Sequence, residues 1–187
     1  MRKGNLFVIS GPSGAGKGTL VACLLREVPD TWVSVSATTR SPRPHEKDGV
    51  DYVFLTEEEF ATLVEQGGFL EWAEVHGYHY GTLRKRVEEH IASGQQVILE
   101  IDVQGADQVR CVMPDAHFIF IEPPSLEELE RRLRGRATES EDVIIKRLET
   151  AKLELLRKKE YDIQLVNDEI PKAAQKLISF VNSCADR

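Results

Sequence analysis

The chain has 187 residues, of which 41% are hydrophobic and 29% charged, and its formal net charge at pH 7 is −7. These values exclude a disordered or fibrous protein and support one substantial hydrophobic core. Because affinity for nucleic acid comes largely from neutralising phosphates, an acidic chain is a poor general binder, and we expect no nucleic-acid partner.

The apolar segments and the cysteines indicate the cellular compartment. The first apolar run, residues 6–9, is too short for the core of a signal peptide, and no later segment reaches the length of a membrane span. Cys23, Cys111 and Cys184 lie far apart and form no CxxC pair, so reduced thiols without a metal or redox role are the simplest interpretation. We therefore expect a cytoplasmic protein with no membrane partner.

The first predicted elements are a strand and a helix. Residues 6–9 form a short apolar run closed by a glycine-rich turn, which is typical of a buried parallel strand. Apolar residues with helical spacing then predict a helix over residues 17–28; they are Leu20, Val21, Leu24, Leu25 and Val28.

The turn between these two elements carries the GxxxxGK core of a phosphate-binding loop. The loop and the two positions after it are Gly11, Pro12, Ser13, Gly14, Ala15, Gly16, Lys17, Gly18 and Thr19. Glycines let backbone N–H groups wrap closely around a phosphate, and the start of the helix adds partial positive charge. Lys17 would place its charge on the β- and γ-phosphates of a nucleotide.

One position of this loop departs from the common pattern. Gly18 stands where a Ser or Thr usually supplies a hydroxyl ligand for Mg²⁺, and Thr19 follows it. We expect the metal to be held mainly by nucleotide phosphates and water, without a confident direct protein ligand, and Thr19 to lie near a phosphate.

Residues 34–82 form a segment of different character, rich in proline, glycine, threonine and aromatic residues. Residues 51–54 alternate as a strand does, and Thr56 with Glu59 matches a capping box at the start of a helix. This composition predicts a small β-containing subdomain inserted into the main fold.

The rest of the chain alternates between strands and helices. Residues 97–99 and 118–121 are predicted buried strands, and residues 163–166 are a weaker candidate. Ser125 with Glu128 matches a second capping box, and a long helix begins near Ser140. Residues 131–140 are dense in arginine and predict an irregular, mobile lid. This alternation favours a parallel sheet covered by helices on both faces.

Two acids follow the strand at residues 97–99. Glu100 and Asp102 would share one face of the strand, because side chains alternate along it. Acids at the carboxyl end of a central strand can orient Mg²⁺ and its water shell, so either residue is a candidate for that role. A solvated strand end explains the same pattern equally well.

Several longer motifs, in order along nearly the whole chain, resemble those of the guanylate kinase family. They are TTRSPRPHEKDGVDYVF at residues 38–54, FLEWAEV at 69–75, IDVQG at 101–105, RGR at 134–136 and VND at 166–168. The resemblance implies an α/β P-loop fold with three layers, a central parallel sheet, an inserted GMP-binding subdomain and an arginine-rich lid. It also implies a single domain, 1–187, with core segments 1–33, 83–130 and 148–187, the insert 34–82 and the lid 131–147.

The resemblance implies transfer of the γ-phosphoryl group of ATP to GMP, and to dGMP, with Mg²⁺ as cofactor, in purine nucleotide metabolism. The residues implied for GMP are Ser36, Arg40, Arg43, Tyr52, Glu71, Tyr80, Thr82 and Asp102. Among them Glu71 would accept hydrogen bonds from the guanine N1–H and 2-amino group, and the arginines and tyrosines would hold the phosphate. The implied catalytic residues are Lys17, Arg132, Arg136 and Arg147, and Asn167 would lie near the adenine of ATP.

Three positions depart from the family's pattern. His45 stands where the family often has glycine, Ala137 replaces the second glycine of a lid motif, and Glu100 replaces a frequent aspartate. None of them removes a proposed catalytic charge.

Two alternatives to the kinase interpretation remain open from the sequence. A guanylate-kinase-like interaction module binds peptides without catalysis, but its phosphate loop is typically degraded, whereas Lys17 and the arginines are present here. A related kinase would act on a phosphosugar, but Glu71, Tyr52 and Tyr80 favour a nucleotide acceptor. The sequence does not determine the oligomeric state.

Overall fold

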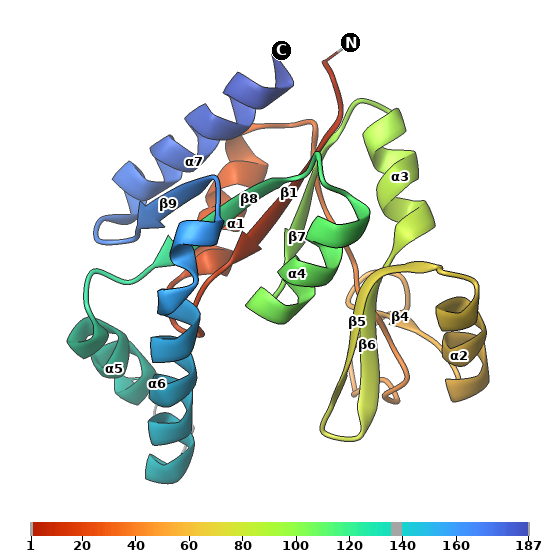
Figure 1. Ribbon diagram of the computed structural model, residues 1–187, viewed down its shortest axis with the longest axis horizontal. Helices are drawn as coiled ribbons and strands as arrows, with labels where there is room; N and C mark the ends of the chain where they lie inside the picture. The colour runs from red at the N-terminus through yellow and green to blue at the C-terminus, as the bar shows by residue number, and fades with distance from the viewer. Residues whose placement is uncertain (1, 136–139, 187) are drawn as a thin grey trace.

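A five-stranded parallel sheet forms the centre of the protein (Figure 1). The computed structural model describes residues 2–135 and 140–186. In sheet order, the strands are β2 (Thr31–Val33), β7 (Gln96–Glu100), β1 (Asn5–Ser10), β8 (His117–Glu122) and β9 (Ile163–Val166). The predicted strands at residues 6–9, 97–99, 118–121 and 163–166 are therefore confirmed. The sequence did not predict β2, which has three residues and is too short to show a pattern.

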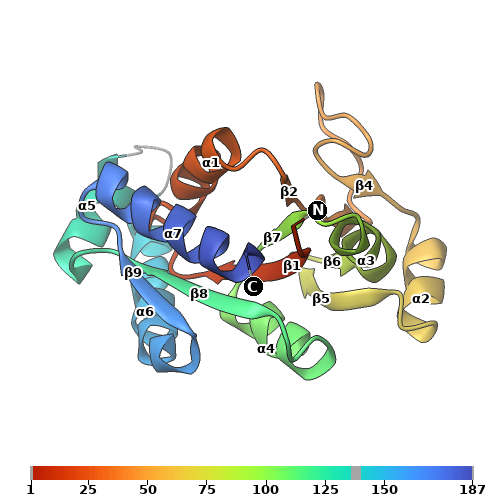
Figure 2. The same cartoon turned by 90° about the horizontal axis from the view of Figure 1, so that it is seen from above.

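Helices cover both faces of this sheet. Figure 2 shows α1 (Lys17–Glu27) and α7 (Ile170–Ala185) on one face, and α4 (Val103–Val112) and α6 (Glu141–Leu156) on the other. The helix predicted over residues 17–28 is thus confirmed, ending at Glu27. Alternate residues of β1 enter the two cores: Phe7 and Ile9 pack with α1 and α7, whereas Leu6 and Val8 pack with α4. The predicted three-layer α/β fold with a central parallel sheet is confirmed.

A second, smaller sheet lies within residues 34–83. Its strands, in sheet order, are β4 (Val53–Phe54), β3 (Ala37–Thr38), β6 (Tyr78–Leu83) and β5 (Phe69–Val75). Helix α2 (Glu57–Glu65) packs on it through its own small core of Ala37, Phe60 and Phe69. The capping box of Thr56 and Glu59 forms as predicted. The alternating stretch at residues 51–54 becomes a strand only at its last two residues.

The chain returns to the main layer through α3 (Arg84–Ala92), whose Val87 is buried in the core under α4. A short 3₁₀ turn, η1 (Lys158–Glu160), joins α6 to β9. Within the described residues, no helix combines the length and the apolar character that a membrane crossing requires.

Helices α5 (Leu126–Gly135) and α6 form a hairpin with its own buried cluster of Leu129, Leu133, Ile144 and Ala151. The irregular stretch predicted at residues 131–140 is wrong for 131–135, which continue α5, while 136–139 lie outside the described residues. The ion pair from Glu130 to Arg134 spans one helical turn and supports the helix there. Helix α6 begins directly after Ser140, as predicted, and continues past the proposed lid boundary at residue 147.

Only one of the two hydrogen bonds of the capping box predicted at Ser125 and Glu128 forms. The Ser125 hydroxyl accepts a hydrogen bond from the Glu128 backbone N–H at 3.1 Å. The Glu128 carboxylate does not return to the backbone, because it accepts hydrogen bonds from Arg131 and Arg132.

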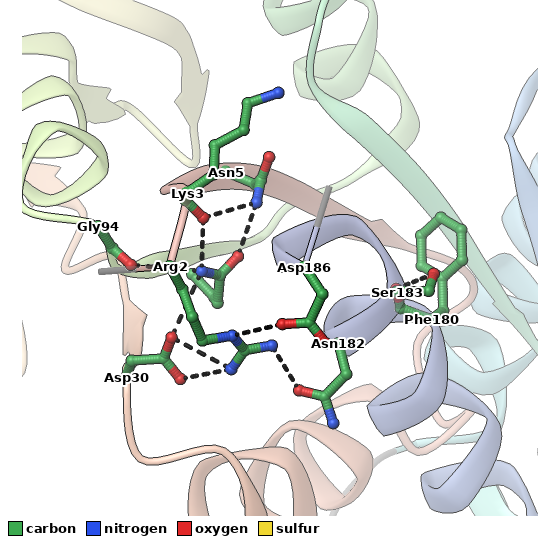
Figure 3. Close-up of polar contacts among 10 residues, drawn as sticks. Arg2, Lys3, Asn5, Asp30, Gly94, Phe180, Asn182, Ser183 and Asp186 are labelled. Atoms are coloured by element: carbon green, nitrogen blue, oxygen red, sulfur yellow. Dashed lines mark hydrogen bonds and ion pairs between the residues drawn. The ribbon is translucent and has the colours of Figure 1, made fainter.

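A polar network closes the amino-terminal edge of the main sheet. The Arg2 guanidinium lies between Asp30, Asn182 and Asp186 (Figure 3), at N–O distances of 3.0, 2.7 and 3.2 Å. Beside it, the fully buried Gln96 amide donates to the Lys3 carbonyl at 2.9 Å and accepts from the Asn5 side chain at 2.9 Å. This network joins the start of β1 and β7 to the end of α7.

Candidate active site

The glycine-rich loop runs from β1 to α1 and forms a ring of backbone groups. Gly11 and Gly16 have φ of 141° and 92°, in the left-handed region that favours glycine. A Cβ at Gly11 would lie 2.0 Å from the Ile121 carbonyl oxygen, so no other residue fits there. The Lys17 ammonium donates to the carbonyls of Gly11 and Pro12 at 2.6 and 3.2 Å, which places its charge inside the loop.

The side chain of Asn167 supports this loop. Its side chain is 3% exposed, and its amide nitrogen donates to the Ala15 carbonyl at 2.8 Å. A Cβ at Gly16 would lie 2.3 Å from the same nitrogen, so loop and amide are in close contact. Among the described residues, its Oδ1 has no hydrogen-bond partner. The sequence suggested a nucleotide contact for Asn167 but not this support of the loop.

A cavity of about 730 Å³ opens beside the loop. It is lined by residues of the loop, of α5 and of the start of α7; they include Gly14, Thr19, Arg131, Arg132 and Asn167. The cavity therefore brings Asn167 and Thr19 together with one of the predicted catalytic arginines.

The predicted catalytic arginines come from the α5–α6 hairpin. Arg132 pairs with Glu128 at 2.8 Å and donates to the Asn167 carbonyl at 3.0 Å. Arg147, in the middle of α6, donates to the Ser13 hydroxyl of the loop at 2.8 Å. Arg131 and Arg132 lower the pKa of Glu128 to about 2. Arg136, the third predicted arginine, lies outside the described residues.

Arg40, Tyr52 and Tyr80 form a cluster beside the second sheet, with Tyr80 on β6, Arg40 after β3 and Tyr52 before β4. The Arg40 guanidinium lies 5.4 Å from the centre of the Tyr52 ring, and the two tyrosine rings meet edge to face at 6.0 Å. Glu46 holds this cluster in place: its carboxylate pairs with Arg40 at 2.9 Å and accepts the Arg43 backbone N–H at 2.7 Å. Glu46 was not among the predicted site residues, although it stands three residues after Arg43, at the spacing of a local turn.

His45 lies between Arg43 and Glu46 in this turn and departs from the family pattern. Its φ is 80°, in the left-handed region where glycine is favoured. The glycine that the family resemblance led us to expect at this position would adopt this conformation without strain.

Glu71 is a buried carboxylate on β5, 9% exposed. The Thr82 hydroxyl on β6 donates to its Oε1 at 2.6 Å. A Cβ at Gly105 would lie 3.1 Å from its Oε2, so the carboxylate packs directly against the first turn of α4. Burial raises the pKa of Glu71, and the negative charge of Asp102 raises it further. Ser36 directly precedes β3, whose Ala37 pairs with Gly81 beside Thr82.

Glu100 and Asp102 have different surroundings. Strand β7 ends at Glu100, and Asp102 caps α4 by accepting the Gly105 backbone N–H at 2.8 Å. The expectation that both acids share one strand face is therefore wrong, because β7 ends at Glu100 and Asp102 is the cap of α4, which begins at Val103. The Glu100 carboxylate oxygens lie 3.8 and 3.9 Å from the position of a Cβ at Gly18, so this acid faces the phosphate loop.

Comparisons with known proteins agree with this geometry. The family model described as guanylate kinase matches residues 3–184. The chain is 54% identical over 181 residues to the guanylate kinase of Rubrobacter xylanophilus, covering 97% of this chain and 95% of that one. It is 56% identical over 178 residues to that of Desulfitobacterium hafniense, with coverage of 95% and 89%. The crystal structure of guanylate kinase from Anaplasma phagocytophilum superposes with a TM-score of 0.76 at 36% identity, covering 100% of this chain and 90% of that chain.

Proposed function

The chain belongs to the guanylate kinase family and is an ATP:GMP phosphotransferase, and on this premise we propose how its residues bind the two nucleotides and move the phosphate. The observation that carries the assignment of roles is the buried Glu71 carboxylate, held by Thr82 in an insert that also carries Arg40, Tyr52 and Tyr80. The insert therefore supplies a selective site for a base at Glu71, next to a cationic site for a phosphate at Arg40.

ATP binds at the glycine-rich loop. Backbone N–H groups of the loop and of the start of α1 donate hydrogen bonds to the β- and γ-phosphates, and the Lys17 ammonium exchanges the Gly11 and Pro12 carbonyls for phosphate oxygens. The cavity of about 730 Å³ beside the loop, lined by Thr19 and Asn167, takes the rest of the nucleotide. Asn167 also supports the loop, because its amide donates a hydrogen bond to the Ala15 carbonyl.

GMP binds in the insert. Arg40, Arg43, Tyr52 and Tyr80 hold its phosphate, and Glu71 accepts hydrogen bonds from the N1–H and the 2-amino group of guanine. Adenine presents a lone pair at N1 and therefore faces the carboxylate without a proton to donate. Sites built around such donors discriminate against an analogue that lacks them by roughly 10⁴–10⁵. Ser36, Thr82 and Asp102 complete the surroundings of the base.

The acceptor is itself a phosphate oxygen, so the reaction needs no general base. The second pKa of a phosphate monoester is about 6, and the oxygen is already anionic near neutral pH. In the transfer, this oxygen bonds to the γ-phosphorus while the bond to the bridging oxygen of ADP breaks, leaving ADP and GDP. The task of the protein is to bring two anions together and to neutralise the charge between them.

The arginines of the α5–α6 hairpin supply this neutralisation. Arg132 contacts Glu128 in this structure, and Arg147 contacts Ser13. Each arginine exchanges its contact for the phosphoryl group while that group is transferred. Arg136 is proposed to act with them. One arginine at such a position is worth roughly 10³–10⁵ in rate.

The residues present fit a magnesium ion that arrives with ATP. Among the described residues, no three His, Cys, Asp or Glu side chains gather to hold a metal ion by themselves. Mg²⁺ commonly binds through substrate phosphates, water and one or two carboxylates, and it neutralises the phosphates when bound. Glu100 faces Gly18 of the loop and is the better candidate for its water shell, because Asp102 is engaged in capping α4. We place the enzyme in the cytoplasm, in purine nucleotide metabolism.

An acceptor panel tests these assignments. Purified protein with ATP and Mg²⁺ is offered GMP, dGMP, AMP, UMP, CMP and a phosphosugar, and ADP release is measured. We expect turnover with GMP and dGMP, and loss of that preference in Glu71→Gln. Equal losses for GMP and ATP in that variant would contradict the role of Glu71. Preferred phosphorylation of the sugar phosphate would contradict the choice of acceptor.

A further inference from the structure

We infer that Gln108 on α4 is a positioning residue for guanine recognition, because it clamps the strand that carries Glu71 to the core of the enzyme. The inference rests on the proposed role of Glu71. Gln108 lies outside the set of nucleotide-binding residues, and its side chain acts on the backbone of β5 rather than on a substrate.

The clamp consists of two hydrogen bonds to one residue of β5. The Trp72 backbone N–H donates to Gln108 Oε1 at 3.1 Å, and Gln108 Nε2 donates to the Trp72 carbonyl at 3.0 Å. A side-chain amide has the same donor and acceptor as a peptide group, so it pairs with both backbone groups as a neighbouring strand would.

The place of β5 in its sheet explains why such a partner is available. β5 is the last strand in the order β4-β3-β6-β5, and β6 pairs with its other edge. Backbone groups on the outer edge of a terminal strand have no strand to bond. Gln108 satisfies those of Trp72, the residue that follows Glu71 directly.

The residue before Glu71 is fixed to the core as well. The register of β5 against β6 shifts between Phe69 and Glu71, which sets Leu70 in an irregular position. Leu70 is 2% exposed and belongs to the core cluster under α4, whereas Phe69 belongs to the core of the insert. Glu71 is therefore held between Leu70 and Trp72, both of which are attached to the main body of the protein.

One face of α4 gathers the contacts that surround the carboxylate. Asp102, Gly105 and Gln108 are spaced by three residues, so each is a neighbour of the next along the helix surface. Asp102 caps the helix, and Gly105 leaves the space into which Glu71 Oε2 fits. Gln108 holds the strand at the distance at which this fit occurs. The position of the base-recognising carboxylate is thus set by α4 and does not follow movements of the remaining insert.

Two substitutions separate the hydrogen bonds from the volume of the side chain. Gln108→Met keeps the length of the side chain and removes both bonds. Gln108→Glu keeps an acceptor for the Trp72 N–H but cannot donate to the Trp72 carbonyl when ionised. Gln175→Met on α7 is the matched control, because Gln175 is an exposed helical glutamine remote from the insert.

The readout is selectivity for the base together with the Michaelis constants. We expect Gln108→Met to raise KM for GMP about tenfold and to leave KM for ATP unchanged, since two neutral hydrogen bonds that position the acceptor site are lost. The preference for GMP over IMP, which lacks the 2-amino group, should fall, and Gln108→Glu should show an intermediate loss. The control should behave as wild type in both measurements.

The parallel variant Glu71→Gln keeps the inference and the proposed function apart. If Glu71→Gln abolishes the preference for GMP over IMP while Gln108→Met leaves it intact, the positioning role is overturned and the role of Glu71 stands. If Glu71→Gln itself leaves the preference intact, the proposed role of Glu71 fails. A drop in stability of Gln108→Met with unchanged KM and preference would make Gln108 a structural residue only and would also overturn the inference.

Discussion

Polar side chains border the central sheet at both ends of its strands, the amino-terminal edge and the carboxyl-terminal edge, and they are used in opposite ways. At the amino-terminal edge, Arg2 binds Asp30, Asn182 and Asp186, and the buried Gln96 is bonded to neighbouring groups of the chain. At the carboxyl-terminal edge, the buried Glu71 reaches the start of α4 from β5 of the second sheet, and it has a hydroxyl partner at 2.6 Å and a repulsive neighbour, Asp102.

The difference shows which groups are reserved for ligands. Groups whose partners lie within the chain stabilise the fold, whereas groups placed near like charge lower stability until a ligand arrives. Substitutions at the first edge should therefore reduce stability and spare activity. Substitutions at the second edge should do the reverse.

Replacement of Lys17 tests the second edge most strongly. We expect Lys17→Ala to lower kcat/KM by roughly 10³-fold or more, as for loss of other catalytic cations in phosphoryl transfer, with little change in thermal stability. Steady-state assay of GDP formation and a melting curve measure the two effects. Lys85→Ala is the control, because the Lys85 side chain on α3 is 89% exposed and pairs with Glu89 of the same helix. Full activity in Lys17→Ala would refute the proposed role of the loop.

Replacement of Glu71 should separate activity from stability. We expect Glu71→Gln to lower kcat/KM for GMP by roughly 10²-fold or more, because its amide N–H₂ meets the donors of guanine, and to leave KM for ATP unchanged. Steady-state assays with each nucleotide varied in turn check this. A matched substitution at Glu74, an exposed residue of the same strand, should leave both constants unchanged.

The same variant should be more stable than the parent, with a defined pH dependence. Burial raises the pKa of Glu71 in the folded protein above its usual value of 4.5, so the folded state binds this proton more tightly than the unfolded state. Stability therefore falls as pH rises through the folded pKa, and the penalty is complete above it. Denaturant unfolding should show Glu71→Gln as the more stable protein at pH 7.5 and the advantage should disappear below pH 4.5. A stability gain that grew as the pH fell would contradict this origin.

Replacement of Arg2 tests the opposite edge. We expect Arg2→Ala to lower the free energy of unfolding by about 1–2 kcal/mol, since the lost contacts are charged hydrogen bonds that are partly exposed to solvent. The constants for ATP and GMP should not change. Arg26→Ala, on the exposed side of α1, is the control for removing a cation. If Arg2→Ala lost activity without losing stability, the expectation that the amino-terminal edge serves stability and the carboxyl-terminal edge serves activity would be wrong.

The sequence predicted those features whose signals are local. The glycine-rich loop, the strand that ends at Glu100 and the helix that follows Ser140 each depend on residues within one or two turns of one another. The continuation of α5 through Arg134 was also readable, because Glu130 stands four residues before it. The arginine-dense composition instead favoured an irregular stretch at these residues.

The features that escaped prediction depend on contacts between distant parts of the chain. Strand β2 exists because Thr31 to Val33 pair with β7, more than sixty residues later. Arg2 meets Asn182 across almost the whole chain, and the amide of Gln108 meets Trp72 from another element. A single sequence contains no periodicity that marks such partners. Glu46 is the exception, since its partner Arg40 is near in sequence and a charge at that spacing is visible.

The smallest expected effect concerns His45, where strain and function meet. Its φ of 80° costs a residue with a Cβ about 1 kcal/mol or more, while glycine loses more chain entropy on folding. We expect His45→Gly to raise the free energy of unfolding by about 0.5 kcal/mol as the balance of these terms. Because Glu46 still pairs with Arg40, KM for GMP should stay the same. A stable variant with a raised KM would instead show that the strained backbone at His45 helps to hold the arginines that bind the phosphate.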